Sequence, residues 1–305
     1  VKMPRGLLIY GEPGLGKTMM AQSFIEASGR KCFQIRKDKS DGSFMDAISE
    51  VFKNAIDNQP AIVFLDDMDK FANGDEIHRN SEEYVAVQTW IDNVKNEDVF
   101  VIATANDVKK LPNSLRRSGR FDVQIFVTYP SIDEAEQIIK FYLKSKNYID
   151  DVDCGLIAKI LNGHSCADLE NVINQAGIYA GFENRDKITT EDIIKSCMRI
   201  IFFAPESMSK LSYDVRKKIA VHEAGHAVIA ELLEPESVNI VSICRHTTNV
   251  GGVTSYNQPD EYFHLFKCME NRVLSLLGGK AAIELVYGEI DTGANSDLHR
   301  AFDIV

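Results

Sequence analysis

Gly11-Glu-Pro-Gly-Leu-Gly-Lys17-Thr18 is the stretch that decides the fold of the first part of this chain. It fits the pattern G-x-x-x-x-G-K-[ST], in which glycines let backbone N–H groups converge on phosphate oxygens and the loop leads into the positive end of a helix. The apolar run Leu7-Leu-Ile-Tyr10 supplies the strand that should precede such a loop. The sequence therefore predicts a nucleotide site on a strand, a loop and a helix.

In a loop of this type the lysine reaches the β and γ phosphates, and the threonine hydroxyl holds Mg²⁺. These roles fall to Lys17 and Thr18. A chance glycine-rich turn is the alternative, and the preceding strand argues against it. The residues expected to line the phosphates are Glu12, Pro13, Gly14, Leu15, Gly16, Lys17, Thr18 and Met19.

A second acidic element follows the apolar run Ala61-Ile-Val-Phe-Leu65. This buried strand ends in Asp66, which is suited to bind Mg²⁺ through water, and Asp67, a candidate catalytic carboxylate. Further along, Asn106 is a candidate to orient the attacking water, and Arg117 and Arg120 are candidates to stabilise charge on the γ-phosphate. Taken singly, each of these last three residues would more often be a polar surface residue.

Short apolar runs alternate with helical stretches up to about residue 129, which indicates a parallel sheet flanked by helices. The expected strands cover residues 7–10, 32–35, 61–65, 100–103 and 123–127. Helical spacing then takes over at 135–143, 168–178 and 192–200, the first of these preceded by a capping box of Ser131 and Glu134. We divide the chain into an α/β domain at 1–129, a small helical domain at 130–203 and a third domain at 204–305, with a linker near 203–207.

His222-Glu223-Ala-Gly-His226 fits the zinc-peptidase pattern H-E-x-x-H. Histidines four residues apart lie on one face of a helix, so His222 and His226 can offer two nitrogens to one zinc ion. Glu223 is then placed to take a proton from zinc-bound water. An amphipathic helix that merely contains two histidines is the alternative.

A catalytic zinc normally takes three protein ligands and leaves one position for water. The metzincin extension is excluded, because Ile229 and Leu232 stand where glycine and histidine are required. His246, His264 and His299 have no ligand spacing. On chemistry alone, the candidates for the third ligand are Glu261, Glu270, Glu284 and Asp297.

Composition narrows the class of protein and its partners. The chain has 305 residues, of which 45% are hydrophobic and 26% charged. This is the composition of a globular protein, and the length is enough for two or three domains. The net charge of -11 argues against a general nucleic-acid binder. No apolar run approaches the roughly 20 residues that span a bilayer. The six cysteines include no C-x-x-C pair, which argues against a cysteine-ligated metal.

In their order, GEPGLGKT, IVFLDD, ATAND, LRRSGRFD, GHSCADLEN and HEAGH resemble the FtsH family of AAA+ ATP-dependent zinc metalloproteases over nearly the whole chain. The resemblance implies an α/β P-loop NTPase (AAA+) domain with a helical lid, then a mainly helical zinc metallopeptidase domain, with Zn²⁺, ATP and Mg²⁺ as cofactors. Thr292-Gly-Ala-Asn-Ser-Asp297 resembles the family's TGASND element, which favours Asp297 as the third ligand.

The resemblance also implies partners and a location. It implies a homo-hexamer in which Arg117 and Arg120 act in trans on the ATP of a neighbour, unfolded polypeptides as substrates, and no nucleic acid. On this reading the chain is a fragment cut at both ends, with a membrane anchor outside it and its catalytic parts on the cytoplasmic side of a membrane.

The segment 276–282 resembles a family helix whose close packing needs small residues. Residues 238–244 and 251–256 are expected to form strands, and an edge strand near the metal can pair with extended substrate.

Two departures from the family keep the function open. Asp67 stands where the family has glutamate, and Ser40-Asp41-Gly42 stands where it has an aromatic pore element, with Phe44 nearby. The first hypothesis is a protease that uses ATP to unfold and processively degrade membrane and cytosolic proteins. The alternatives are a zinc peptidase with a weak or purely structural ATPase, and a non-proteolytic remodelling ATPase.

Overall fold

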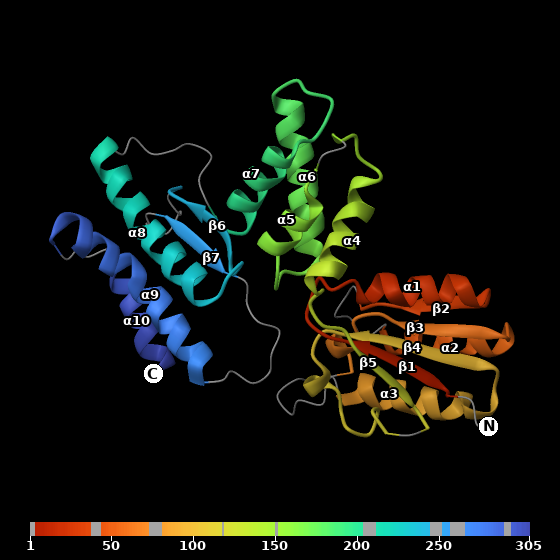
Figure 1. The fold of residues 1–305 in the computed structure, drawn as a ribbon. Helices are drawn as coiled ribbons and strands as arrows, with labels where there is room; N and C mark the ends of the chain where they lie inside the picture. Colours follow the sequence, from red (N-terminus) through yellow and green to blue (C-terminus); the bar gives the residue numbers. More distant parts are fainter. Residues whose placement is uncertain are drawn as a thin grey trace. The chain divides into compact units, whose positions relative to one another are not determined.

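The computed structural model describes residues 4–37, 44–72, 81–117, 119–149, 152–203, 212–244, 252–256, 266–289 and 294–305. The chain forms two compact units, Val1–Tyr129 and Pro130–Val305 (Figure 1). The second unit contains both the helical segment and the histidine-bearing segment expected from the sequence. The expected pore element at 40–42, most of the linker at 203–207, and Glu261, His246 and His264 lie outside the described residues.

The first unit is built on a parallel sheet with the strand order β2-β3-β4-β1-β5. The expected strands are confirmed, with small shifts at their ends. Their bounds are β1 Gly6–Tyr10, β2 Lys31–Ile35, β3 Ala61–Leu65, β4 Val99–Ala105 and β5 Val123–Phe126.

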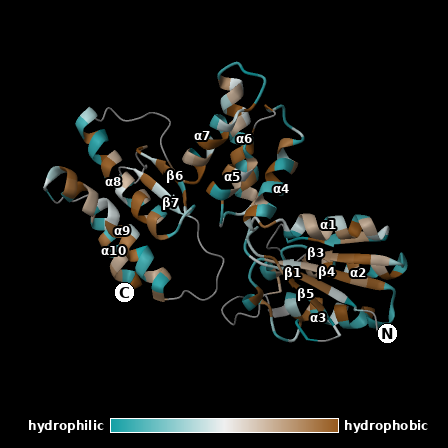
Figure 2. Ribbon diagram, in the orientation of Figure 1, coloured by the Kyte–Doolittle hydropathy of each residue, from teal (hydrophilic) through white to brown (hydrophobic). Residues whose placement is uncertain are grey.

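Helices cover both faces of this sheet, which is why its central strands are apolar throughout rather than alternating. α1 (Lys17–Ser28) lies on one face, and α2 (Phe44–Asp57) and α3 (Ser81–Asn93) lie on the other (Figure 1). On β3, Val63 and Leu65 enter the core beneath α2 and α3, whereas Ile62 and Phe64 enter the core beneath α1. The hydrophobic strands lie between helices with more polar outer faces (Figure 2).

Because β1, β3 and β4 are parallel, their carboxyl ends share one edge of the sheet, and the predicted nucleotide-binding loops all leave from that edge. Three short 3₁₀ helices follow or precede the strands: η1 Met68–Lys70, η2 Val94–Asn96 and η3 Val108–Lys110.

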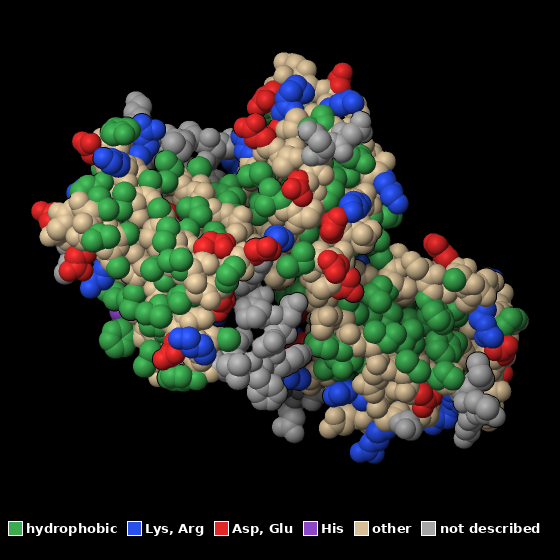
Figure 3. Space-filling model, in the orientation of Figure 1, with side chains coloured by type: hydrophobic (Ala, Val, Ile, Leu, Met, Phe, Trp, Pro, Cys, Tyr) green, Lys and Arg blue, Asp and Glu red, His purple; other side chains and the backbone are tan. Residues whose placement is uncertain are grey.

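β5 is an edge strand with exposed apolar side chains, and α1 also exposes apolar side chains. Figure 3 shows hydrophobic side chains in green over one face of this unit, and the exposed residues include Met19, Met20, Phe24, Val123, Ile125 and Phe126.

The second unit begins with the helices α4 Ile132–Leu143, α5 Cys154–Ile160, α6 Cys166–Phe182 and α7 Thr190–Ile200. The capping box of Ser131 and Glu134 at the start of α4 is confirmed. α6 and α7 begin with boxes of the same kind, Ser165 with Asp168 and Thr189 with Asp192. These boxes satisfy backbone N–H groups that a helix leaves unpaired, so they fix where each helix starts.

The remaining elements are α8 Tyr213–Leu233, β6 Val238–Ser242, β7 Val253–Tyr256, α9 Phe266–Tyr287 and α10 Asn295–Ile304. β6 and β7 form an antiparallel pair. The close packing expected of the small residues in α9 is confirmed, because a Cβ atom built on Gly225 of α8 would lie 2.4 Å from the Gly278 carbonyl oxygen of α9. Among the helices of the described segments, none combines the length and apolar character that a membrane span requires.

Candidate functional site

The phosphate loop leaves β1 and leads into α1. Gly14 and Gly16 have φ angles of 78° and 85°, which residues with a side chain rarely adopt, so glycine is needed to turn the chain here. Lys17 is buried, and its Nζ donates a hydrogen bond to the Glu12 carbonyl at 2.7 Å. Burial lowers the pKa of Lys17, although Asp67 nearby acts in the opposite direction. The amino group of Lys17 therefore already lies within the phosphate loop.

Asp66 connects the end of β3 to this loop. The Thr18 hydroxyl donates to Asp66 Oδ1 at 3.0 Å, and the Thr104 hydroxyl donates to the same oxygen at 2.8 Å. A hydroxyl and a carboxylate from separate elements therefore meet where the sequence predicts Mg²⁺, and oxygen atoms of this kind are the ligands that Mg²⁺ prefers.

Asp67 lies beside Asp66, and both of its carboxylate oxygens accept hydrogen bonds. Asn106 Nδ2 donates to Asp67 Oδ1 at 3.1 Å, and Lys70 Nζ donates to Asp67 Oδ2 at 2.7 Å. Burial alone would raise the pKa of Asp67, but the hydrogen bonds from Lys70 and Asn106 outweigh it and lower the pKa. The structure thus places Asp67, the candidate catalytic carboxylate, in hydrogen-bond contact with Asn106, the candidate to orient the attacking water.

Three potential metal ligands converge in the second unit. His222 and His226 are one turn apart on α8, and Asp297 lies in the first turn of α10. Asp297 Oδ2 lies 3.2 Å from His222 Nε2 and 3.3 Å from His226 Nε2, and the two nitrogens are 3.0 Å apart. Glu270 and Glu284 take no part in this cluster, which is the one group of metal-ligating side chains found among the described residues.

The spacing of these atoms, 3.0 to 3.3 Å, is slightly shorter than that of a zinc site. A tetrahedral zinc with ligands at about 2.0–2.2 Å holds its ligand atoms roughly 3.3–3.6 Å apart. Two imidazole nitrogens and a carboxylate oxygen are gathered within one group, and a cation placed among them would be bound by all three. Burial would raise the pKa of Asp297, but the hydrogen bonds from His222 and His226 outweigh it and hold that pKa well below its ordinary value.

α9 orients one ligand and leaves room for the metal. His226 Nδ1–H donates to the Ser275 carbonyl at 2.8 Å, which fixes the ring with Nε2 on the side of Asp297, so Nε2 is the nitrogen that a metal would use. A Cβ atom built on Gly279 would lie 2.5 Å from His226 Nε2 and 2.7 Å from His222 Nε2. Glycine at this position therefore keeps the space around the ligand atoms open.

Glu223 follows His222 on α8 and is only 7% exposed. Burial raises the pKa of Glu223, and a hydrogen bond from Thr254 acts in the opposite direction. A carboxylate that is shielded from bulk water next to three metal ligands has the surroundings of a general base.

Two family models match this chain. The model of the ATPase family associated with various cellular activities (AAA) matches residues 7–129, and that of peptidase family M41 matches residues 209–305. The ATP-dependent zinc metalloprotease FtsH 2 of Petrotoga mobilis is 33% identical over 317 residues, which cover 100% of this chain and 50% of that protein. The FtsH proteins of Aquifex aeolicus and Bacillus subtilis are each 31% identical and match 99% of this chain.

The chain belongs to the FtsH family. This confirms the resemblance drawn from the motifs, and the fold class with it: an α/β AAA+ domain followed by a mainly helical M41 peptidase region. The chain spans about half the length of the FtsH relatives it matches, 50% of the protein from each of the three species.

One of the two arginines that the FtsH resemblance assigns to a neighbouring subunit is engaged within the chain. Arg120 donates from Nε and Nη2 to the two carboxylate oxygens of Asp92 on α3, at 3.0 and 2.7 Å, and from Nη1 to the Ser114 carbonyl. The hydrogen bond to Arg120 lowers the pKa of Asp92 to about 2. Arg117, three residues earlier, is exposed.

Four residues around the nucleotide site were missed in the sequence: Arg36, Asp69, Lys70 and Thr104. Thr104 donates to Asp66 and accepts from the Asp67 N–H at 2.9 Å, and Asp69 accepts from the Asn106 N–H at 3.0 Å. A lone hydroxyl within the apolar run of β4 was a usable signal for Thr104, because a buried polar group needs a partner. Nothing in the local sequence marks Arg36, which lies 3.8 Å from Asp66.

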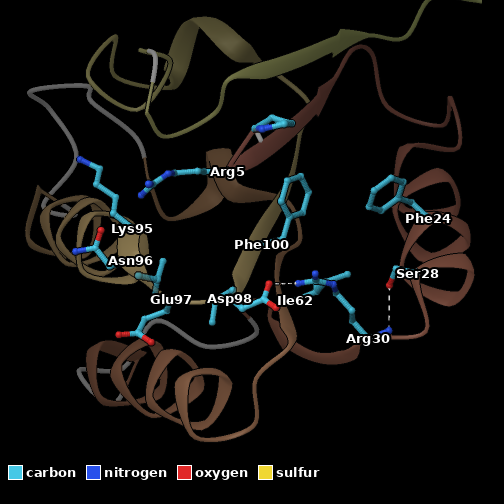
Figure 4. A pocket seen from close by; sticks show the side chains of 13 residues that line it. Arg5, Phe24, Ser28, Arg30, Ile62, Lys95, Asn96, Glu97, Asp98 and Phe100 are labelled. Carbon is cyan, nitrogen blue, oxygen red and sulfur yellow. Dashed lines mark hydrogen bonds and ion pairs between the residues drawn. The ribbon is translucent and has the colours of Figure 1, made fainter. Parts of the chain in front are cut away.

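The first unit has a cavity of about 690 Å³, and Figure 4 shows the side chains that line it. Phe24 and Ser28 of α1, Phe100 of β4 and the ion pair of Arg30 with Asp98, at 2.7 Å, contribute to its lining. Asp98 and Phe100 lie at the amino end of β4, whereas the phosphate loop lies at the carboxyl edge of the sheet. The cavity is therefore not part of the candidate site.

Proposed function

We propose that this chain carries the machinery of an ATP-dependent zinc metalloprotease, which unfolds membrane and cytosolic proteins and degrades them processively. The observation that carries the proposal is the convergence of His222, His226 and Asp297 beside the buried Glu223, in a chain that also holds a phosphate loop. The names of the FtsH relatives, ATP-dependent zinc metalloproteases, pair the same two activities.

In the peptidase site, His222, His226 and Asp297 would hold Zn²⁺, which supplies a Lewis acid for the scissile carbonyl and lowers the pKa of water. Glu223 accepts a proton from the attacking water and delivers it to the leaving amide nitrogen. In the described part of the chain β7 pairs with β6 alone, so its other edge is available to an extended polypeptide. Pairing through the backbone would give little sequence preference.

In the ATPase unit, the loop residues 12–19 would bind the phosphates of ATP, with Lys17 reaching the β and γ phosphates. Thr18 directly and Asp66 through water would hold Mg²⁺. Asp67 and Asn106 would orient the attacking water, since the two side chains already lie in hydrogen-bond contact at the carboxyl edge of the sheet.

The proposed protease also implies partners: neighbouring subunits of a ring, polypeptide substrates and a membrane. We assign Arg117 to the γ-phosphate of a neighbour in a homo-hexamer, because its side chain is exposed, and we assign Arg120 to holding its loop against α3 through Asp92. The exposed apolar side chains of α1 and β5 give the first unit a surface that a neighbour would cover. Unfolded polypeptides are the substrates, and a membrane anchor outside these residues holds the catalytic parts at the cytoplasmic side.

A second function is a zinc peptidase whose ATPase unit only binds nucleotide and assembles the ring. The surroundings of Asp67 favour it, because Lys70 neutralises the carboxylate and the side chain is shorter than glutamate. The metal cluster and the buried Glu223 weigh against a remodelling ATPase that does not cleave its partners.

The test is degradation of casein by the full-length protein with zinc present and ATP either supplied or withheld. For the coupled protease we expect intact casein to be lost only when ATP is supplied. Cleavage that proceeds equally without ATP would instead establish the peptidase with a structural ATPase.

The Glu223→Gln variant is the control for this experiment. The amide cannot accept the proton but keeps the size of the side chain, so we expect one zinc per chain, unchanged ATP turnover and cleavage reduced by about 100-fold or more. Retained cleavage would refute Glu223 as the base. Absence of cleavage by the wild type with zinc bound would shift the function to the remodelling ATPase.

A further inference from the structure

The segment that leads into β7 and β7 itself lie directly against the carboxylate of Glu223. The Thr254 hydroxyl donates to Glu223 Oε2 at 2.7 Å, and it lies 3.3 Å from the Glu223 backbone carbonyl oxygen. In the part of the chain that the structure describes, this is the one side-chain hydrogen bond to that carboxylate. Glu223 and Thr254 are 31 residues apart in sequence, so their contact depends on β7 packing on α8.

The two carboxylate oxygens of Glu223 have different surroundings. Oε2 is bound to Thr254, whereas Oε1 faces Gly252, where an added Cβ atom would lie 2.6 Å away. A side chain at residue 252 would therefore clash with the Glu223 carboxylate, and threonine two residues later fixes Oε2. A carboxylate held by one oxygen keeps its plane and leaves the other oxygen open to accept a proton.

From this geometry we propose that Thr254 is a positioning residue, whose hydroxyl holds Oε2 of the Glu223 carboxylate and leaves Oε1 as the oxygen that accepts the proton of the attacking water. The inference rests on the proposed peptidase function. Glutamate has three rotatable side-chain bonds, so the general base would otherwise have to be oriented at each turnover, which costs rate.

A purely structural Thr254 would have different consequences. Its hydroxyl would then only satisfy a buried carboxylate, and its loss would lower stability or zinc content rather than the rate of the chemical step. A positioning role acts on kcat and leaves KM and the metal in place, because Thr254 contacts none of the three metal ligands in the described structure.

The experiment compares the full-length wild type with the Thr254→Val and Thr254→Ser variants on a peptide substrate. Valine keeps the β-branched shape without the hydroxyl, and serine keeps the hydroxyl. For valine we expect kcat to fall by about 10- to 100-fold, KM to change by less than about threefold and zinc to remain at one per chain. Serine should restore kcat to within about fivefold of the wild type.

Ser255→Ala is the matched control. It removes a hydroxyl from the same strand, but successive side chains of a strand point to opposite faces, so it should leave kcat unchanged. An unchanged kcat in Thr254→Val, an effect on KM alone, or a loss of zinc or of melting temperature in that variant would overturn the inference.

Crystal structures of zinc-loaded wild type and Thr254→Val decide the inference without turnover. We expect the same three ligands in both and a Glu223 carboxylate rotated away from them only in the variant. An unmoved carboxylate would overturn the positioning role. A wild type that fails to cleave would refute the proposed peptidase function, and the position of the carboxylate would still show whether Thr254 holds it.

Discussion

Asp67 is the residue on which the proposed coupling of ATP to proteolysis depends. Its side chain is 18% exposed, and Lys70 occupies one of its oxygens while Asn106 occupies the other. Arg36 lies within 4.0 Å as well. An aspartate in this position reaches one methylene less far toward the phosphates than a glutamate. A short, neutralised carboxylate orients water less well than a longer one that extends past Lys70.

The Asp67→Glu variant is therefore expected to hydrolyse ATP faster than the wild type, by about three- to tenfold in kcat. The affinity for ATP should not change, because in the proposed site Lys17 and the loop would bind the phosphates without Asp67. Phosphate release under saturating ATP measures the first quantity, and equilibrium binding of a fluorescent ATP analogue measures the second. Equal turnover in the two proteins would mean that Asp67 already places the water correctly, or has no part in the step.

At the scale of elements, the packing of α8 against α9 shapes the candidate metal site. A Cβ atom on Gly278 would lie 2.5 Å from the Gly225 carbonyl oxygen, so neither glycine can gain a side chain without separating the helices. The same contact places Ser275 and Gly279 of α9 against His226. A change in the distance between α8 and α9 would therefore also change the orientation of His226.

Gly278→Ala is expected to destabilise the protein by about 2 kcal/mol or more and to lower its zinc affinity, because the added methyl group is forced against backbone. Gly181→Ala in α6 is the matched control: the same change meets nothing within 4 Å and should be neutral or stabilising by up to about 1 kcal/mol. Thermal melting and zinc titration measure the two effects. Similar melting temperatures for both variants would show that the helices tolerate separation.

The sequence predicts elements well where the signal is local. The apolar runs of a doubly covered parallel sheet marked all five strands, and the box of Ser131 with Glu134 marked the start of α4. H-E-x-x-H placed two potential ligands on one helix face because its spacing matches the helical repeat. Asp297 needed the family resemblance, because its position depends on how α10 packs on α9 rather than on any spacing.

Contacts between distant segments had no such signal. Thr254 reaches Glu223, and Arg120 reaches Asp92, only after β7 and α3 have packed. The sequence separation within each pair matches no helix or strand repeat. Nothing in the sequence therefore marks Thr254 as a partner of Glu223, or Arg120 as a partner of Asp92. The environment of a catalytic group is a tertiary property, whereas the group itself often belongs to a local motif.

At the scale of the whole molecule, the proposed ring requires an arginine that serves a neighbour, and Arg117 is the exposed candidate. A mixture of two inactive variants separates action in trans from action in cis. Lys17→Ala subunits cannot bind ATP but still offer Arg117, whereas Arg117→Ala subunits bind ATP but offer no arginine. If Arg117 acts in trans, an Arg117→Ala subunit next to a Lys17→Ala subunit contains one complete site.

We expect each variant alone to lose ATP turnover by about 100-fold or more. In an equal mixture, each half of a site is intact with a probability of about one half. About a quarter of the interfaces should therefore contain a complete site and regain activity. ATP turnover of the remixed subunits measures this recovery, and dilution of the wild type with Lys17→Ala subunits gives the baseline. If Arg117 acted within its own subunit, every subunit in the mixture would lack one essential residue and no activity would return. Recovery would therefore require both a shared site and an assembly in which the subunits contact one another head to tail.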